Sequence, residues 1–262
     1  MRWIFRLIFW VRFIFNVDAL SFFFSRIQSK HDTGLSKDAN DDAKVNEIVL
    51  ESLSKVLENF PDSSEKDRLL TDSINWSKNA KLKQSSSGAG SPLLHAIAAK
   101  ACVKSGNVRL AFKHFLYAQS ARDFAKLVCS QISKGHTSEY DLFVLRTVLS
   151  YLCAGAEVKE AELLLREIET RAKRNAKDFP LLRFLNRLFV LIPQGDDADE
   201  LFHLLVQVYA PGFSSRDPSI YKLIKTIDIK FFGGVPPTSA AASRSPFGGG
   251  NMMNMMRMMM GK

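Results

Sequence analysis

The sequence predicts an all-α solenoid, a stacked array of antiparallel helix pairs, over residues 44–234. Apolar residues in this range recur at i, i+3 and i+4, the spacing of helices that bury one face. Glycine and proline interrupt the pattern at short intervals and fit helix ends and helix starts. Alternating apolar and polar runs closed by Asn-Gly or Asp-Gly, which indicate β-hairpins, do not occur. Because the breaks are short, neighbouring helices must run antiparallel.

The composition is that of a globular protein. The 262 residues are 46% hydrophobic and 24% charged, which excludes a wholly disordered chain and a polytopic membrane protein. The three cysteines form no Cys-x-x-Cys pair, so we predict a reducing compartment, the cytosol. The formal net charge of +9 is concentrated in residues 91–193. A basic surface attracts nucleic acid, anionic lipid or an acidic protein, and the lack of an aromatic stacking platform disfavours nucleic acid.

Residues 1–43 precede the array as an apolar aromatic leader and a flexible linker. Three arginines and one aspartate interrupt the leader, residues 1–24, so no clean transmembrane span remains. As a helix, the leader would be basic on one face and aromatic on the other, as in membrane-surface helices. Alternatively, it is a mis-assigned start or packs on the helices behind it, which is the interpretation we favour. Residues 25–43 are rich in Asp, Ser, Lys and Asn and predict the linker.

Two helices are predicted between this linker and residue 91. The first carries its apolar stripe over residues 45–57 and the second over residues 69–76. Asp62 and Glu65, at the start of the second helix, are spaced as a capping box. Residues 77–91 are rich in Ser and Gly and predict a weak internal linker. Their Gly-x-Gly has no strand ahead of it, so it does not predict a phosphate-binding loop.

The remaining helices follow one another from Pro92 to Gly234. The predicted segments are Pro92–Ser105, Asn107–Gln119, Arg122–Lys134, Ser138–Ala154, Glu157–Lys173, Pro180–Ile192, Asp197–Tyr209 and Asp217–Phe232. The breaks include Gly106, Gly135, Gly155, Pro193-Gln194-Gly195 and Pro211-Gly212. Ala111 and Phe115 lie four residues apart after a Gly turn, as in the second helix of a tetratricopeptide repeat, so we predict a tetratricopeptide-like α-solenoid.

The C-terminal tail, residues 235–262, is rich in Gly and Met and predicts disorder. Its unbranched methionines are either a flexible apolar contact for a partner or low-complexity sequence without a role. We favour the second reading.

No motif for catalysis, a cofactor or a metal is present, so we predict that the chain is not an enzyme. The five histidines are dispersed, and none has a second His or a Cys at ligand spacing on one helix face. The acidic residues Asp196, Asp197, Asp199 and Glu200 precede an apolar helix. Carboxylates there stabilise the positive end of the helix dipole, which we prefer to a metal cluster as the explanation.

A basic run closes the predicted helix Glu157–Lys173 and continues into the next loop. It consists of Arg171, Lys173, Arg174 and Lys177. Cations at a helix C-terminus are favoured by the dipole, which explains the run without a ligand. The functional alternative is contact with an acidic partner protein.

Several short segments, in this order along the chain, resemble the Golgi-to-ER traffic protein four family. They are VLESL (49–53), WS (76–77), SPLLH (91–95), HFL (114–116), SEYDLF (138–143), LSYLC (149–153), PLLRFL (180–185) and the stretch 209–237 with its FFGGVPP ending. Together they span residues 48–237, about seven tenths of the chain. Their order and the FFGGVPP ending make the resemblance specific.

The resemblance implies a non-enzymatic α-solenoid adaptor in the cytosolic targeting of tail-anchored membrane proteins to the ER. Members of the family bridge a targeting ATPase, through the N-terminal half, to a ubiquitin-like or BAG-type chaperone scaffold held by the C-terminal half. The family places the ATPase near repeats that precede the segment matching 48–53. Here the leader and linker occupy that place, so we expect the scaffold as the partner more firmly than the ATPase.

The residues that we expect to contact or support a partner lie in the basic run and the C-terminal helices. They are Arg171, Arg174, Tyr209, Arg216, Asp217, Tyr221, Phe231 and Phe232. For Phe231 and Phe232 individually, we favour core packing over partner contact. The alternative function is a membrane-associated helical-repeat protein anchored by residues 1–24.

Overall fold

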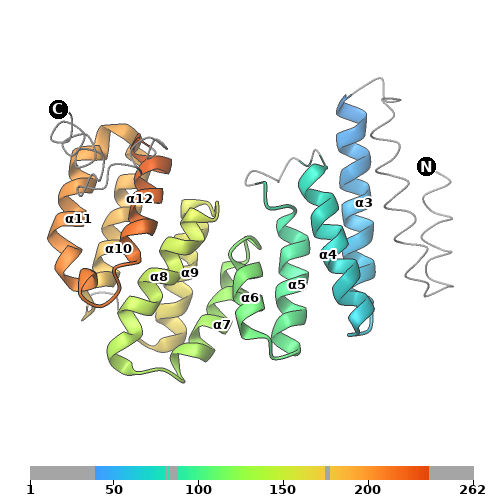
Figure 1. Cartoon of the computed structure of the whole chain (residues 1–262), viewed down its shortest axis with the longest axis horizontal. Helices are drawn as coiled ribbons and strands as arrows, with labels where there is room; N and C mark the ends of the chain where they lie inside the picture. Colours follow the sequence, from blue (N-terminus) through green and yellow to red (C-terminus); the bar gives the residue numbers. More distant parts are fainter. Residues whose placement is uncertain (1–38, 81, 83–87, 175–177, 236–262) are drawn as a thin grey trace, which may run out of the picture.

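The computed structural model describes residues 39–80, 82, 88–174 and 178–235, and all regular structure in these ranges is helical (Figure 1). This confirms the predicted all-α class. The α-helices are α3 (Ala39–Asn59), α4 (Ser64–Asn79), α5 (Pro92–Lys104), α6 (Val108–Phe115), α7 (Ala121–Ile132), α8 (Tyr140–Cys153), α9 (Val158–Ala172), α10 (Pro180–Leu191), α11 (Asp199–Ser214) and α12 (Ile220–Phe231). Two short 3₁₀ helices, Thr137–Glu139 and Ile192–Ala198, precede α8 and α11.

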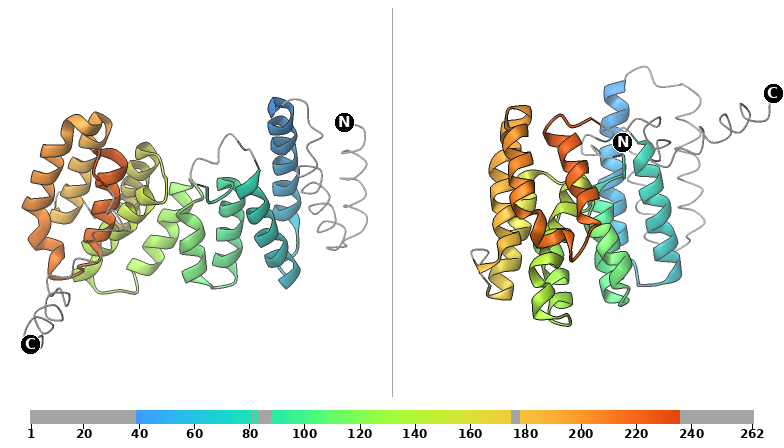
Figure 2. Two further views of the ribbon diagram at one scale, coloured as in Figure 1. Left: turned by 45° about the horizontal axis from the view of Figure 1, so that its top comes forward. Right: turned by 60° about the vertical axis from the view of Figure 1, so that its left-hand side comes forward.

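The helices form an elongated array with α3 at one end and α11 at the other (Figures 1 and 2). Alternate helices stack, α7 on α9 and α8 on α10, while α5 pairs with α6 and α10 with α11. This pattern is that of a helical-repeat solenoid. The last helix departs from it, because α12 turns back and packs on α8.

Contacts between residues distant in sequence hold α12 against α8. The Lys230 ammonium donates to the carbonyl oxygen of Leu152 at 2.8 Å. The Cys153 thiol donates to the carbonyl oxygen of Leu223 at 3.5 Å. These polar contacts flank the apolar interface and set the register of the two helices.

The interior consists of two buried apolar clusters. The smaller joins α3, α4 and the first half of α5, and the larger runs from the second half of α5 to α12. In the larger cluster Ala111 is fully buried and Phe115 is 2% exposed, as the tetratricopeptide-like spacing predicts. The Phe115 ring stacks on Phe124, with ring centroids 5.5 Å apart. The small Ala111 side chain lets the paired helix approach, and the aromatic rings fill the space beside it.

The start of α4 differs from the predicted capping box. The N-cap is Ser63, whose side-chain oxygen accepts from the backbone N–H of Lys66. The Asp62 carboxylate is engaged elsewhere, because it pairs with the Lys66 ammonium at 2.8 Å. Helix α4 then continues through Ser77, whose hydroxyl oxygen accepts from the Ser91 N–H at 2.9 Å and holds the start of α5.

The predicted break at Pro211-Gly212 is wrong, because α11 continues through both residues to Ser214. Phe213, in the last turn of the helix, is fully buried and anchors that turn in the core. Gly212 lies against Leu181, where an added Cβ would stand 3.1 Å from Cδ2. Tertiary packing therefore overrides the local preference of proline and glycine for a helix end.

Among the described residues, no helix combines the length and apolarity needed to cross a membrane. The leader, residues 1–24, and the Gly/Met-rich tail after Val235 lie outside the described residues. All three cysteines are free thiols.

Candidate protein-interaction surface

The predicted charged residues at the end of α11 act as braces within the array. The Arg216 guanidinium pairs with both carboxylate oxygens of Asp141, at 3.0 and 3.3 Å, and donates to the Ser138 carbonyl oxygen at 2.6 Å. Asp217 pairs with Arg146 at 3.2 Å. The Ser219 hydroxyl, which donates to the Asp217 carboxylate, lowers the pKa of that carboxyl, and Arg146 adds to the effect. Both residues therefore join the α11–α12 turn to α8.

The predicted aromatic residues divide between core and surface. Phe232 is 2% exposed and stacks on Phe202, with ring centroids 4.3 Å apart. Phe231 is half-buried beside the Lys230 ammonium. Tyr209 is half-buried against Phe184. Tyr221 is the most accessible of the four, at 43% exposed.

The two predicted arginines of the basic run lie at the end of α9. Arg171 pairs with Glu167 of the same helix at 3.0 Å. The Arg174 guanidinium lies 4.5 Å above the centre of the Tyr140 ring. Since Tyr140 and Asp141 are adjacent, Arg174 and Arg216 both meet the start of α8. The structure thus brings these two predicted residues to one end of α8, and it does not bring Arg171 to the aromatic residues of α11 and α12.

An exposed apolar surface that our sequence analysis missed lies on α11. Leu201, Leu204 and Val208 are 53%, 56% and 62% exposed, and we call them the α11 stripe. Their i, i+3, i+7 spacing places them on one face of the helix. Val190, on the neighbouring α10, is 65% exposed. The α11 stripe and Val190 are therefore a candidate interaction surface.

The signal for this stripe was present in the sequence. From Leu201 to Tyr209 the apolar residues occupy more than the one face that a surface helix buries. Phe202 and Leu205 face the core, at 1% and 8% exposed, and leave the stripe facing outward. Arg187, on α10, holds its guanidinium 5.7 Å from the centre of the Tyr209 ring, so a cation borders the apolar face.

Three side chains of the types that can ligate a metal gather on α11 and α12 in the described part of the chain, namely Asp199, His203 and Asp228. Asp199 also lies in the first turn of α11 with Glu200. That position agrees with the predicted dipole role of the acidic run.

The stacked array of antiparallel helices makes this chain a helical-repeat protein. A family model described as Golgi to ER traffic protein 4 matches residues 37–260, and the chain belongs to this family. The resemblance that we predicted from the short segments is thereby confirmed.

Named relatives agree with the family match. The chain is 28% identical over 220 residues to the Golgi to ER traffic protein 4 homolog of Xenopus tropicalis, covering 81% of this chain and 64% of that protein. It is 27% identical over 227 residues to the Homo sapiens homolog, covering 84% and 64%. To Protein GET4 of Arabidopsis thaliana it is 28% identical over 151 residues, covering 55% and 45%. The chain thus spans just under two thirds of the length of the animal relatives.

The fold matches a solved structure as well. The crystal structure of C. therm. Get4 superposes with a TM-score of 0.61 at 22% identity, covering 81% of this chain and 68% of that one. At this identity the match establishes the shared α-solenoid fold.

Proposed function

We propose that this chain is a non-enzymatic cytosolic adaptor in the targeting of tail-anchored membrane proteins to the ER. It bridges a targeting ATPase and a ubiquitin-like or BAG-type chaperone scaffold. The observation that carries the proposal is the α11 stripe, which lies at the C-terminal end of the array. The family resemblance assigns the scaffold to the C-terminal half of the chain.

The chemistry of the stripe specifies the contact. A partner that covers Leu201, Leu204 and Val208 removes about half of each side chain's surface from water. Full burial of one such side chain contributes roughly 1.5–3 kcal/mol, so covering the exposed parts of the three chains contributes about 2.5–5 kcal/mol in all. Arg183 and Arg187 are exposed on α10. The partner segment is therefore apolar at its centre and acidic at its rim.

Binding of the purified scaffold to the full chain tests this assignment. Leu204→Asp places a charge at the centre of the contact, and we expect calorimetry to show an affinity at least tenfold lower. Val103→Asp is the matched control, because Val103 is 45% exposed on α5, away from the stripe. Equal loss in both variants, or wild-type affinity in Leu204→Asp, would refute the role of the stripe.

The bridging role requires that both partners bind one chain at the same time. An adaptor holds the ATPase and the scaffold on separate surfaces, so mixing all three proteins produces a ternary complex by analytical ultracentrifugation. Displacement of one partner by the other would contradict bridging while leaving scaffold binding intact.

A further inference from the structure

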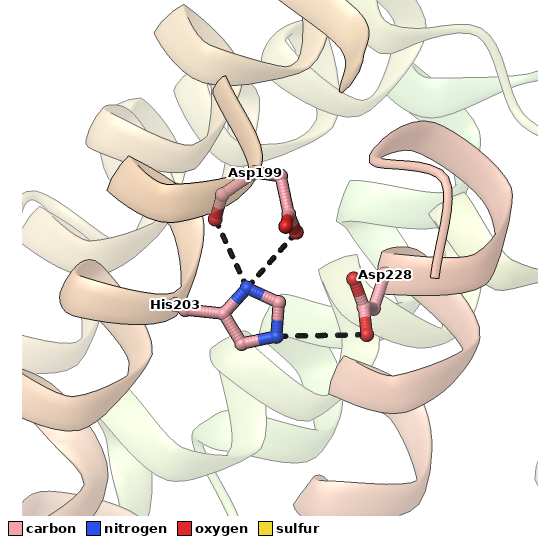
Figure 3. Close-up of side chains that lie close together, drawn as sticks. All are labelled: Asp199, His203 and Asp228. Carbon is pink, nitrogen blue, oxygen red and sulfur yellow. Dashed lines mark hydrogen bonds and ion pairs between the residues drawn. The ribbon is translucent and has the colours of Figure 1, made fainter. Parts of the chain in front are cut away.

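The side chains of Asp199, His203 and Asp228 converge between α11 and α12 (Figure 3). Asp199 and His203 lie one turn apart on α11, and Asp228 lies on α12. Their candidate ligand atoms all lie within 4.8 Å of one another. The sequence did not predict this metal-ligand group, because no second histidine or cysteine lies at ligand spacing from His203 on its own helix.

The hydrogen bonds of His203 fix which ring nitrogen carries a proton. Its Nδ1 lies 3.0 Å from the backbone carbonyl oxygen of Asp199 and 2.9 Å from that residue's carboxylate oxygen Oδ1. Both oxygens accept hydrogen bonds only, so Nδ1 must be the donor. In the neutral ring the lone pair is then on Nε2, the nitrogen that metal-binding histidines use when Nδ1–H donates to an oxygen.

The lone pair on Nε2 faces a second acceptor across a gap. Nε2 lies 3.8 Å from the Asp228 carboxylate oxygen Oδ2, beyond hydrogen-bonding distance. Two acceptors facing each other repel unless a cation lies between them. Zinc binds histidine nitrogen and carboxylate oxygen at about 2.0–2.2 Å, and tetrahedral angles then place the two ligand atoms roughly 3.3–3.6 Å apart. The observed gap of 3.8 Å is therefore close to the separation that one bridging ion requires.

One further observation makes Asp228 an incomplete acceptor, and a second shows how its carboxylate is accommodated. Its other oxygen, Oδ1, is buried and has no hydrogen-bond partner among the described residues. Gly234 lies against the carboxyl group, where an added Cβ would stand 2.6 Å from Cγ. The absence of a side chain at position 234 therefore allows the carboxylate to occupy its place beside His203.

We infer that Asp199, His203 and Asp228 form a binding site for one Zn²⁺ ion that links α11 to α12. His203 Nε2 and the Asp228 carboxylate are the ligands, and water completes the coordination. Asp199 orients the imidazole through Nδ1, as carboxylates do behind zinc-bound histidines. The site lies on the helix that carries the α11 stripe, and it does not depend on the proposed function.

The alternative occupant of the gap is a proton. Protonated His203 would form ion pairs with both carboxylates, and such a group takes up no metal. The pKa of His203 is raised, first by the hydrogen bond to the Asp199 backbone and then by the two carboxylates. Metal binding must displace this proton, so the measurement belongs above neutral pH.

Titration of the metal-free full chain with ZnCl₂, followed by calorimetry, tests the site. We expect one ion per chain in the wild type and no binding at this site in His203→Gln or Asp228→Asn. Asp199→Asn keeps both ligands and loses the orienting carboxylate, so its affinity is expected to fall by about 10- to 100-fold. MgCl₂ is expected to give no binding, because magnesium prefers a shell of oxygens alone.

Two controls separate this site from other histidines. His136→Ala removes an exposed histidine outside the group and is expected to bind like the wild type. His114→Ala removes a ring whose Nδ1 lies 3.0 Å from that of His95, a place among the described residues where two imidazoles meet and could bind zinc instead. Zinc binding lost in His114→Ala and kept in His203→Gln would overturn the inference.

Thermal unfolding supplies a second readout, since all of these side chains are partly exposed and their variants should fold. Zinc is expected to raise the melting temperature of the wild type and of His136→Ala, and to leave that of His203→Gln unchanged. A wild-type chain that takes up no zinc by calorimetry would equally overturn the inference.

Discussion

The two buried clusters of the array differ in how their outer surfaces are completed. In the α3–α5 cluster, the buried hydroxyl of Ser73 donates to the Leu69 carbonyl oxygen of its own helix at 2.7 Å. The C-terminal cluster instead gains a returning helix, α12, and aromatic contacts such as Phe202 with Phe232. It nevertheless leaves the α11 stripe uncovered. The proposed function therefore places the partner on the C-terminal cluster rather than on the N-terminal one.

The strongest test of this comparison removes the contact that closes α12 on the array. Phe232→Ala deletes a ring that is 2% exposed, and we expect a loss of about 3–5 kcal/mol in the free energy of unfolding by urea. Tyr221→Ala, at an exposed ring of α12, is the control and should cost under about 1.5 kcal/mol. Hydrogen exchange should accelerate in α8 and α12 and stay unchanged in α3 and α4. Equal acceleration in both regions would show that the clusters unfold as one unit.

The junction between the clusters is expected to lose stability in acid. His95 Nε2 lies 3.2 Å from the Ala89 carbonyl oxygen, so it is the donor there, and His114 Nδ1–H must donate to His95 Nδ1 at 3.0 Å. Burial lowers the pKa of His114 to about 4, with a further contribution from His95. The unfolded chain therefore binds more protons between about pH 6.5 and 4, and stability falls as the pH is lowered through that window.

The size of this acid effect can be measured against a variant that does not titrate. We expect a loss of about 1–3 kcal/mol between pH 7 and pH 4.5, since the ring is only partly buried. His114→Gln keeps a donor for His95 and removes the titration, so its unfolding free energy should depend less on pH. An identical pH dependence in the two proteins would contradict the role of the pair.

The ion pair between Arg216, after the end of α11, and Asp141 on α8 should contribute less to the free energy of unfolding. The Arg216 side chain is 34% exposed, and its paired contact with Asp141 is expected to stabilise the fold by about 1 kcal/mol. Arg216→Lys keeps the charge and loses the two-pronged geometry, so it should recover only part of what Arg216→Ala loses. Full recovery by lysine in urea unfolding would show that charge alone matters.

The smallest expected effect is that of His203, and its pH dependence has the opposite sign to that of the His95–His114 pair. The pKa of His203 is raised, first by the hydrogen bond to the Asp199 carbonyl oxygen and then by the two carboxylates. These contacts of the charged ring stabilise the fold fully below about pH 6.5, and their contribution is lost as the pH rises through the raised pKa. At 59% side-chain exposure the effect is weaker than at His114. The difference in unfolding free energy between wild type and metal-free His203→Gln should therefore shrink with rising pH. A difference that grows with pH would contradict the assignment.

The helices could be predicted from the sequence because their signals are local. The i, i+3, i+4 pattern and the Ala111–Phe115 spacing depend on neighbours within one turn or two. The failure at Pro211 has the opposite cause, since the burial of Phe213 and the contact of Gly212 with Leu181 decide the helix end. The cap at Ser63 was missed because the neighbouring Asp62 is drawn to Lys66.

The candidate surface was harder to predict than the fold, because exposure depends on distant parts of the chain. The excess of apolar residues on α11 is visible in the sequence, but which of them stay uncovered is not. Likewise, Arg216 meets Asp141 and Lys230 meets Leu152 across more than 70 residues. Such contacts make Arg216, a predicted partner residue, a brace within the array as well, and no local sequence pattern predicts them.

The most direct test of the central claim is hydrogen exchange of the full chain with and without the purified chaperone scaffold. The adaptor model predicts slower exchange in α11, centred on the α11 stripe, with no change in α3 and α4. Slowing confined to α3 and α4, or no complex between the two purified proteins, would contradict it.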